Sequence, residues 1–221
     1  MMRRSNYDGN PNIGVFAVAN ESLAFVAHDA VDSFVDSIER TLDVECIRTT
    51  VADSYVVGSL VAMNSNGAIV SGLAGERELD VIRSKIPVAT LNDKLNAAGN
   101  NILVNDKGAI VNPEIDNKSM KEIEDALGVE CVRGTIADIV TVGSSCRVTN
   151  KGIAVCADAT DDDIALIKDV LKVDNIVKTT LNHGCKFIAP GVLANSKGAL
   201  VGDLTTPIEM GKLEDALDLY D

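Results

Sequence analysis

The sequence predicts an α/β protein in which five similar units close into a ring. Three observations predict this fold. A turn-and-strand pattern recurs five times, a second landmark keeps step with it, and a spare strand stands at the N-terminus without a partner nearby in the sequence. Five such units fill all 221 residues.

The recurring pattern is a four-residue turn followed by a short apolar strand. Its clearest copy is NDKGAIV, which starts at Asn105, and the others are NESLAFV from Asn20, NSNGAIV from Asn64, TNKGIAV from Thr149 and NSKGALV from Asn195. Asn or Asp before Gly is typical of a hairpin turn, and we expect these glycines to have positive φ angles. The fourth positions of the turns are 44, 41, 44 and 46 residues apart. A period of that length indicates an array of repeats.

The second landmark lies nine residues before each of those fourth positions. It is a glycine four times, at Gly14, Gly58, Gly99 and Gly143, and an alanine once, at Ala189. A unit of about 44 residues cannot bury its own apolar face, so neighbouring units must share a core. We therefore expect a single domain of five repeats over residues 1–221, with approximate bounds 10–50, 51–91, 92–135, 136–180 and 181–221.

Each unit is predicted to run hairpin, helix, strand. The helices are marked by apolar residues at helical spacing, namely Val31, Phe34, Val35, Ile38 and Leu42; Leu79, Ile82 and Ile86; Met120, Ile123 and Leu127; Ile164, Ile167 and Leu171; and Leu213 and Leu217. Thr160 and Thr206 are predicted N-caps, and Ser119 with Glu122 is a predicted capping box. Closing strands are expected at 44–51, 87–91, 129–135 and 176–180.

The fifth unit ends without room for its closing strand, and residues 3–7 supply a spare one. Arg4 lies ten residues before Gly14, as Arg48 lies ten before Gly58, so the N-terminus imitates the end of a unit. If this strand completes the fifth unit, the array closes, the hairpins surround the axis and the helices lie outside. A closed ring leaves no free sheet edge, so we expect a monomer.

Composition limits the classes of partner. The net charge is −13, aromatic residues make up 3% of the chain and Trp is absent. These values argue against a protein that binds nucleic acid mainly by neutralising phosphates or stacking bases, DNA included, and they suit a basic protein partner. No apolar run approaches the ~20 residues of a membrane helix, and MMRRSNYDGNPN is not a signal peptide, so we expect a cytoplasmic protein without membrane contact.

The cysteines and histidines do not predict a metal site or a cofactor. The five cysteines are an odd number without a CxxC pair, and we expect free thiols that serve as small apolar side chains. A metal site needs clustered ligands, and the chain has only two histidines, His28 and His183.

Several stretches together resemble the translation initiation factor 6 family in its archaeal form. They are NAAGN (96–100), GTIADIVTVGS (134–144) and ANSKGALVG (194–202) with Thr205 and Thr206 after it, combined with the five-fold ring and its N-terminal closing strand. The resemblance covers essentially the whole chain. It implies a pentein fold and a non-enzymatic role: the family binds the large ribosomal subunit on its intersubunit face, near a ribosomal protein and the sarcin–ricin loop of the rRNA, and blocks premature joining of the small subunit.

The resemblance also suggests contact residues. The turns are expected on one face of the ring and the joints between units, around Gly14, Gly58, Gly99 and Gly143, on the other. Because the resemblance places the NAAGN loop on the ribosome-facing side, Asn100 is the first candidate. The remaining candidates, in joints or at strand ends, are Asn101, Ser59, Ser144, Arg4, Arg48 and Arg133. For the three arginines, rRNA contact and a structural role bonding neighbouring units both remain open.

Two other functional classes remain as alternatives. Penteins include guanidine-modifying enzymes that resemble one another in using a nucleophilic Cys with a His, and His183 and Cys185 are the only such neighbours here. They fall in a joint two residues longer than its counterparts, which we expect to be a flexible insertion and a poor scaffold for catalysis. His28 lies beside Asp29 without a nearby Cys. The third class is a general protein-binding module.

Overall fold

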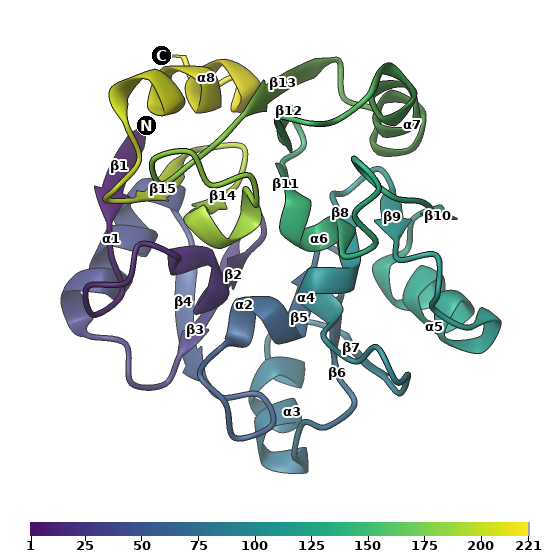
Figure 1. Ribbon diagram of the computed structural model, residues 1–221. Helices are drawn as coiled ribbons and strands as arrows, with labels where there is room; N and C mark the ends of the chain where they lie inside the picture. Colours follow the sequence, from purple (N-terminus) through teal and green to yellow (C-terminus); the bar gives the residue numbers. More distant parts are fainter. Residues whose placement is uncertain (221) are drawn as a thin grey trace.

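The computed structural model describes residues 1–220, and it confirms the pentein-type ring of five pseudo-symmetric units. Five three-stranded sheets surround a central axis, and the long helices lie on the outside (Figure 1). β1 and α8, the first and last elements, lie at the same edge of the ring (Figure 1). None of the helices in this part of the chain is long and apolar enough to cross a membrane.

Every unit begins with a short helical turn. Unit one contains the 3-10 helix η1 (Ile13–Val15), β2 (Ala17–Ala19), β3 (Leu23–Ala27), α1 (Asp32–Leu42) and β4 (Glu45–Thr49). Unit two contains α2 (Val57–Leu60), β5 (Val61–Met63), β6 (Ala68–Ser71), α3 (Glu76–Arg83) and β7 (Val88–Leu91). Unit three contains α4 (Ala98–Asn101), β8 (Ile102–Val104), β9 (Ala109–Val111), α5 (Asn117–Leu127) and β10 (Cys131–Arg133).

The last two units keep the same order. Unit four contains α6 (Val142–Ser145), β11 (Cys146–Val148), β12 (Gly152–Cys156), α7 (Asp161–Leu171) and β13 (Asn175–Thr179). Unit five contains the 3-10 helix η2 (Ala189–Gly191), β14 (Val192–Ala194), β15 (Ala199–Gly202) and α8 (Pro207–Leu217), and its closing strand is β1 (Met2–Ser5).

One topology serves all five sheets. The two hairpin strands are antiparallel, and the closing strand runs parallel to the second of them, as in the register of β3 with β4 from Leu23↔Glu45 to Ala27↔Thr49. In unit five the N-terminal strand takes this place, since β1 pairs with β15 from Met2↔Ala199 to Ser5↔Gly202. The prediction that the N-terminus completes the fifth unit is therefore confirmed, with the strand at 2–5 rather than 3–7.

Each hydrophobic core extends from one unit into the preceding one. The core beneath α5, for example, combines Ile123 and Leu127 of unit three with Ala62 and Ile69 of the unit two hairpin. The same division holds in the other four clusters, each of which joins one unit's helix to the preceding unit's hairpin. A single unit therefore cannot complete its core alone, as expected for a repeat of this length.

The turn glycines are needed for close packing rather than for their backbone angle. Among the described residues, positive φ at glycine occurs only at Gly9, Gly128 and Gly184, so the expectation of positive φ at Gly108 and its equivalents is wrong. A Cβ on Gly108 would lie 2.1 Å from the carbonyl oxygen of Val170, in the last turn of the next unit's helix. Gly67, Gly152 and Gly198 approach the next helix in the same way. Only a residue without a side chain allows this approach.

Leu23, the exception among the turn positions, faces a shorter helix. α3 has 8 residues, whereas the other four long helices have 11. The turn of unit one therefore meets no last helical turn, and the Leu23 side chain packs instead against the core that contains Leu79 and Ile82. The unit that lacks the turn glycine is thus the one whose neighbouring helix is short.

A belt of buried amides links the five turns. The Nδ2 of Asn20 donates to Asn64 O (2.8 Å), that of Asn64 to Asn105 O (3.2 Å), that of Asn105 to Thr149 O (3.2 Å) and that of Asn195 to Asn20 O (3.1 Å). Three of these amides also donate to the last residue of the next helix; for Asn105 that acceptor is Leu171 O at 2.9 Å. Thr149 has no amide and interrupts the belt.

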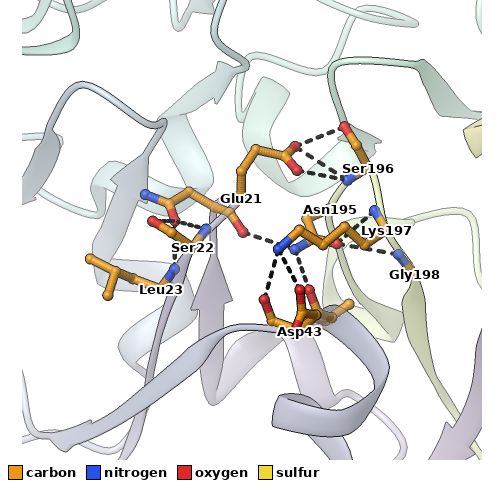
Figure 2. A network of polar contacts seen from close by, with 10 residues as sticks. Glu21, Ser22, Leu23, Asp43, Asn195, Ser196, Lys197 and Gly198 are labelled. Atoms are coloured by element: carbon orange, nitrogen blue, oxygen red, sulfur yellow. Dashed lines mark hydrogen bonds and ion pairs between the residues drawn. The ribbon is translucent and has the colours of Figure 1, made fainter.

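Figure 2 shows the corresponding contacts where unit five meets unit one. The Ser196 hydroxyl and backbone N–H donate to the Glu21 carboxylate, and Lys197 Nζ donates to the Asp43 carbonyl (2.8 Å) just beyond α1. Lys107 and Lys151 donate to helix ends in the same manner. Turn side chains of one unit thus satisfy carbonyl groups that the next unit's helix leaves without intrahelical partners.

The predicted helix starts are confirmed in units four and five and wrong in unit three. Thr160 with Asp163 and Thr206 with Glu209 form capping boxes. In unit three the N-cap is Asp116, which accepts from the Ser119 backbone N–H (2.7 Å), and Ser119 is buried inside the helix. The predicted box of Ser119 and Glu122 is three residues too late because Asp116 already satisfies the helix start.

The close approach at the turns predicts the effect of a single methyl group. Gly108→Ala should lower the free energy of unfolding by about 1–3 kcal/mol, because the new Cβ forces the turn away from Val170. Gly211→Ala is the control: nothing lies within 4 Å of a Cβ there, so this exposed helical site should gain up to ~1 kcal/mol. Urea denaturation measures both changes. Equal stability of Gly108→Ala and the parent would contradict the packing explanation.

The interrupted belt predicts a stabilising substitution. Thr149→Asn should raise the free energy of unfolding by about 1 kcal/mol, because its Nδ2 would lie where the other amides bond the next turn and the next helix. The reverse change, Asn105→Thr, removes two buried hydrogen bonds and should lower it by about 1–3 kcal/mol. Both are measured by urea denaturation. A Thr149→Asn protein less stable than the parent would show that the gap is filled in another way.

Candidate functional site: the joint face

The ring has two different faces, which follow from the direction of its strands. The second hairpin strand of each unit starts at the four-residue turn, and the closing strand runs parallel to it. Both strands therefore end on the side of the ring away from the turns. The loops after these strands, the starts of the long helices and the joints lie on that side too. We call this end the joint face and the other the turn face. Figure 1 shows α2, α4 and α6 grouped around the axis.

The joints approach one another around the axis through glycine. A Cβ on Gly58 would lie 2.0 Å from Gly14 O, one on Gly99 2.0 Å from Gly58 O, and one on Gly143 2.2 Å from Gly99 O. A Cβ on Gly14 would likewise lie 2.1 Å from Ala189 O. Within this ring of joints lies an axial cavity of about 60 Å³, lined by residues that include Ser59, Asn100 and Ser144.

The predicted joint residues divide into lining and buried side chains. Ser59, Asn100 and Ser144 are half-buried and line the axial cavity, so the structure brings three units' candidates to one site. The Ser144 hydroxyl donates to Thr141 O (2.6 Å). Asn101 is only 4% exposed: its Nδ2 donates to Leu95 O (3.1 Å) and Ala97 O (3.0 Å). Asn101 therefore holds the loop that presents Asn100.

The three predicted arginines lie at the rim of the joint face, close to the ends of their strands. Arg133 donates to Ile115 O (2.9 Å) and Asn117 Oδ1 (2.9 Å), at the start of its own unit's helix. Arg48 makes the equivalent contacts with Ala30 O (3.3 Å) and Asp32, and Arg4 Nε donates to Met210 Sδ (3.1 Å). The interpretation that these arginines bond neighbouring units is therefore wrong. Each steadies a helix of its own unit while remaining exposed.

The joint face also carries exposed apolar side chains that the sequence patterns did not identify. Tyr55, Val140 and Phe187 lie in the loops just before the joints, with 38–47% of their surfaces exposed. Leu73 and Leu204 follow the second hairpin strands and are more than half exposed. In the sequence, each of these residues is an apolar residue in an otherwise polar loop. Comparing the repeats does not distinguish such a residue from one that belongs to the core. Apolar groups gathered in this way are typical of protein interaction surfaces.

The loops of the joint face are tight turns tied down by carboxylates. Consecutive residues with positive φ form them, such as Ala52 with Asp53 and Ala137 with Asp138. Glu78 of α3 accepts from Ala52 N (2.8 Å) and Asp53 N (3.0 Å) across the joint between units one and two. Asp163 of α7 accepts from Ala137 N (3.0 Å) in the same way, so these two loops are preorganised.

The loop of His183 and Cys185 is held in the same manner, so the expected flexible insertion is wrong. Glu209 accepts from His183 N (3.2 Å) and Gly184 N (2.8 Å), and Cys185 pairs with Leu181. Burial pushes the pKa of Glu209 up, but hydrogen bonds from the Thr206 backbone, the Thr180 hydroxyl and the Gly184 backbone outweigh it and lower the pKa to about 2. Glu209 is thus ionised and structural.

Three of the five cysteine thiols are held in their protonated form. Burial raises the pKa of the Cys46, Cys131 and Cys146 thiols to about 12, which disfavours the reactive thiolate. Over residues 1–220, no hydrogen bond joins the side chains of His183 and Cys185, and no group of three or more His, Cys, Asp or Glu is placed to hold a metal ion.

A family model described as eIF-6 family matches residues 2–216, nearly the whole chain. The chain belongs to the eIF-6 family. It is 40% identical over 220 residues to a protein of Thermoplasma acidophilum named Translation initiation factor 6, a match that covers 98% of this chain and 100% of the relative. Proteins of that name from Methanoculleus marisnigri (42%, 94% of each chain) and Methanocaldococcus jannaschii (37%, 99% of each chain) are similarly close.

The lowered pKa of Glu209 predicts a pH-dependent contribution to stability. Because the folded pKa of about 2 lies below the ordinary 4.5, the contribution is complete above pH ~5 and is lost as the pH falls towards 2. Glu209→Gln should therefore lower the free energy of unfolding by about 2 kcal/mol at pH 7, with the difference shrinking below pH ~5. Glu114→Gln, in an exposed loop, is the control and should change nothing. Urea denaturation across pH measures both, and a pH-independent difference would contradict this role.

Proposed function

We propose that this protein binds the large ribosomal subunit through its joint face and thereby prevents premature association with the small subunit. It acts as a translation initiation factor without catalysis, by steric exclusion. The relatives named Translation initiation factor 6 support the role in translation. The observation that carries the choice of face is the contrast between the two ends of the ring.

The polar groups of the four-residue turns are largely used within the ring and are less available to a partner. Turn residues bond one another and the helix ends, as Asn105, Asp106 and Lys107 do. The joint face instead exposes apolar side chains over a framework of fixed loops, with a half-buried Asn100 near the axis. A rigid surface that loses little conformational entropy on binding favours affinity.

The charge of the molecule supports a ribosomal protein as the main partner and rRNA as the lesser one. A net charge of −13 repels phosphates but attracts a basic protein surface. The exposed Arg4 and Arg133 at the rim supply localised positive charge for limited rRNA contact, near the sarcin–ricin loop, whereas the charge of Arg48 is paired with Asp32. A total interface of about 1,200–2,000 Å² suffices for a specific complex. We further propose a cytoplasmic monomer.

Co-sedimentation with separated archaeal subunits tests this function. The protein should pellet with the large subunit alone, reduce subunit joining and show a shallow dependence on salt, because protein contacts dominate. Asn100→Ala should weaken binding about fivefold or more, corresponding to loss of one interface hydrogen bond at about 1 kcal/mol. Arg40→Ala, in the last turn of α1 towards the turn face, is the matched control and should bind normally.

Two outcomes would favour other functions. Binding that persists on joined ribosomes indicates a general protein-binding module, because an anti-association factor must lose its place when the small subunit is present. Hydrolysis of arginine-type substrates that disappears in Cys185→Ala would support a guanidine-modifying enzyme. Pelleting with neither subunit contradicts the proposed function itself.

A further inference from the structure

The residue four positions after each joint residue lies in the first hairpin strand, next to the core of the following unit. In four units it is a buried apolar residue: Val18, Ala62, Leu103 and Leu193, each packed in the cluster of the following unit. In unit four the equivalent residue is Arg147, four residues after Gly143. A guanidinium group therefore occupies a place that is otherwise apolar.

The Arg147 side chain lines the axial cavity and has few partners. Its Nη2 donates to Ala189 O of unit five (3.2 Å), while Nε is fully buried without a hydrogen bond. Over residues 1–220, Arg147 takes part in no salt bridge, and no acidic side chain lines the cavity. A guanidinium has five N–H donors, so most of its donor capacity is unused.

This arrangement leaves a positive charge without an acidic partner, on a half-buried side chain whose Nε is fully buried. Burial lowers the pKa of Arg147 to about 10, so the group is still protonated at neutral pH. Removing an ion from water costs several kcal/mol unless an opposite charge or hydrogen bonds replace the lost hydration. The chain has 33 acidic residues, yet none lines this cavity among the residues described.

We propose that a small monovalent inorganic anion, chloride in the simplest case, binds in the axial cavity against the Arg147 guanidinium. A cavity of about 60 Å³ exceeds the roughly 10–15 Å³ that one water-sized species requires. Ser59 and Asn100 also line it and add neutral hydrogen-bond donors to the single positive charge. One charge in a small axial cavity fits one compact anion. The proposal is independent of ribosome binding.

Thermal unfolding in chloride against gluconate, at equal sodium concentration, tests the site. Chloride at ten times its dissociation constant should raise the folding equilibrium constant about tenfold, which for a chain of this size raises Tm by about 3 °C. The rise should saturate. The variant Arg147→Leu introduces leucine, which two of the equivalent positions carry. It should lose the saturable rise in Tm while retaining any general effect of the salts. Arg77→Met, which removes an exposed arginine on α3, should respond like the parent.

Crystals grown or soaked in bromide locate the ion directly. An anomalous peak within hydrogen-bonding distance of the Arg147 guanidinium, absent in Arg147→Leu, is the expected result. An equal chloride response in the parent and Arg147→Leu, or a cavity without a bromide peak in the parent, would overturn the proposal. These measurements use the isolated protein, so they do not depend on whether the proposed function is correct.

Discussion

The extension of every hydrophobic core across a unit boundary is the constraint on which the rest of the structure depends. Because each cluster joins one unit's helix to the preceding unit's hairpin, a unit removed from the ring would expose apolar surface on both sides. An open row of five would leave such surface at its two ends. Closure removes both ends at once, and the chain achieves it by placing its first strand against β15.

Closure in turn requires backbone to approach backbone, which explains where the glycines lie. The five sheets do not continue into one another through strand pairing, so the units meet through side chains and carbonyl groups. Near the axis Gly58 and Gly99 approach the carbonyl oxygens of the preceding joints, and at the turn face Gly108 approaches the next helix. Two layers of contact, one at each face, fix the angle between neighbouring units.

The fold could be predicted from sequence because its signals are local and repeated five times. A hairpin turn, an apolar helix stripe and a closing strand each lie within one unit, and Thr160 and Thr206 reveal their capping boxes within four residues. The spare N-terminal strand was visible for the same reason. Errors occurred where the answer depends on the neighbouring unit, as with the φ of Gly108, whose glycine is required by Val170.

The candidate site was less predictable than the fold for the same physical reason. That Asn101 is buried and Asn100 is not depends on how α4 sits against the axis, and adjacent residues of one type give no hint of it. The roles of Arg48 and Arg133 depend on helix starts 16 residues away in the sequence. Exposure of Tyr55 and Phe187 likewise reflects the arrangement of loops from different units.

The departures from five-fold symmetry near the axis concentrate between units four and five. Here Ala189 replaces the joint glycine, Thr149 interrupts the amide belt, and Arg147 replaces an apolar core residue. Ala189 carries a Cβ where the other joints have glycine, and the Arg147 side chain reaches across the boundary to Ala189 O. Towards the outside the same two units remain in close contact, since Gly152 approaches Ala216 O and Lys151 donates to Asp218 O. Units four and five therefore meet through the core that Ala154 shares with Val192 and Leu213, through these peripheral contacts and, near the axis, through the Arg147 side chain.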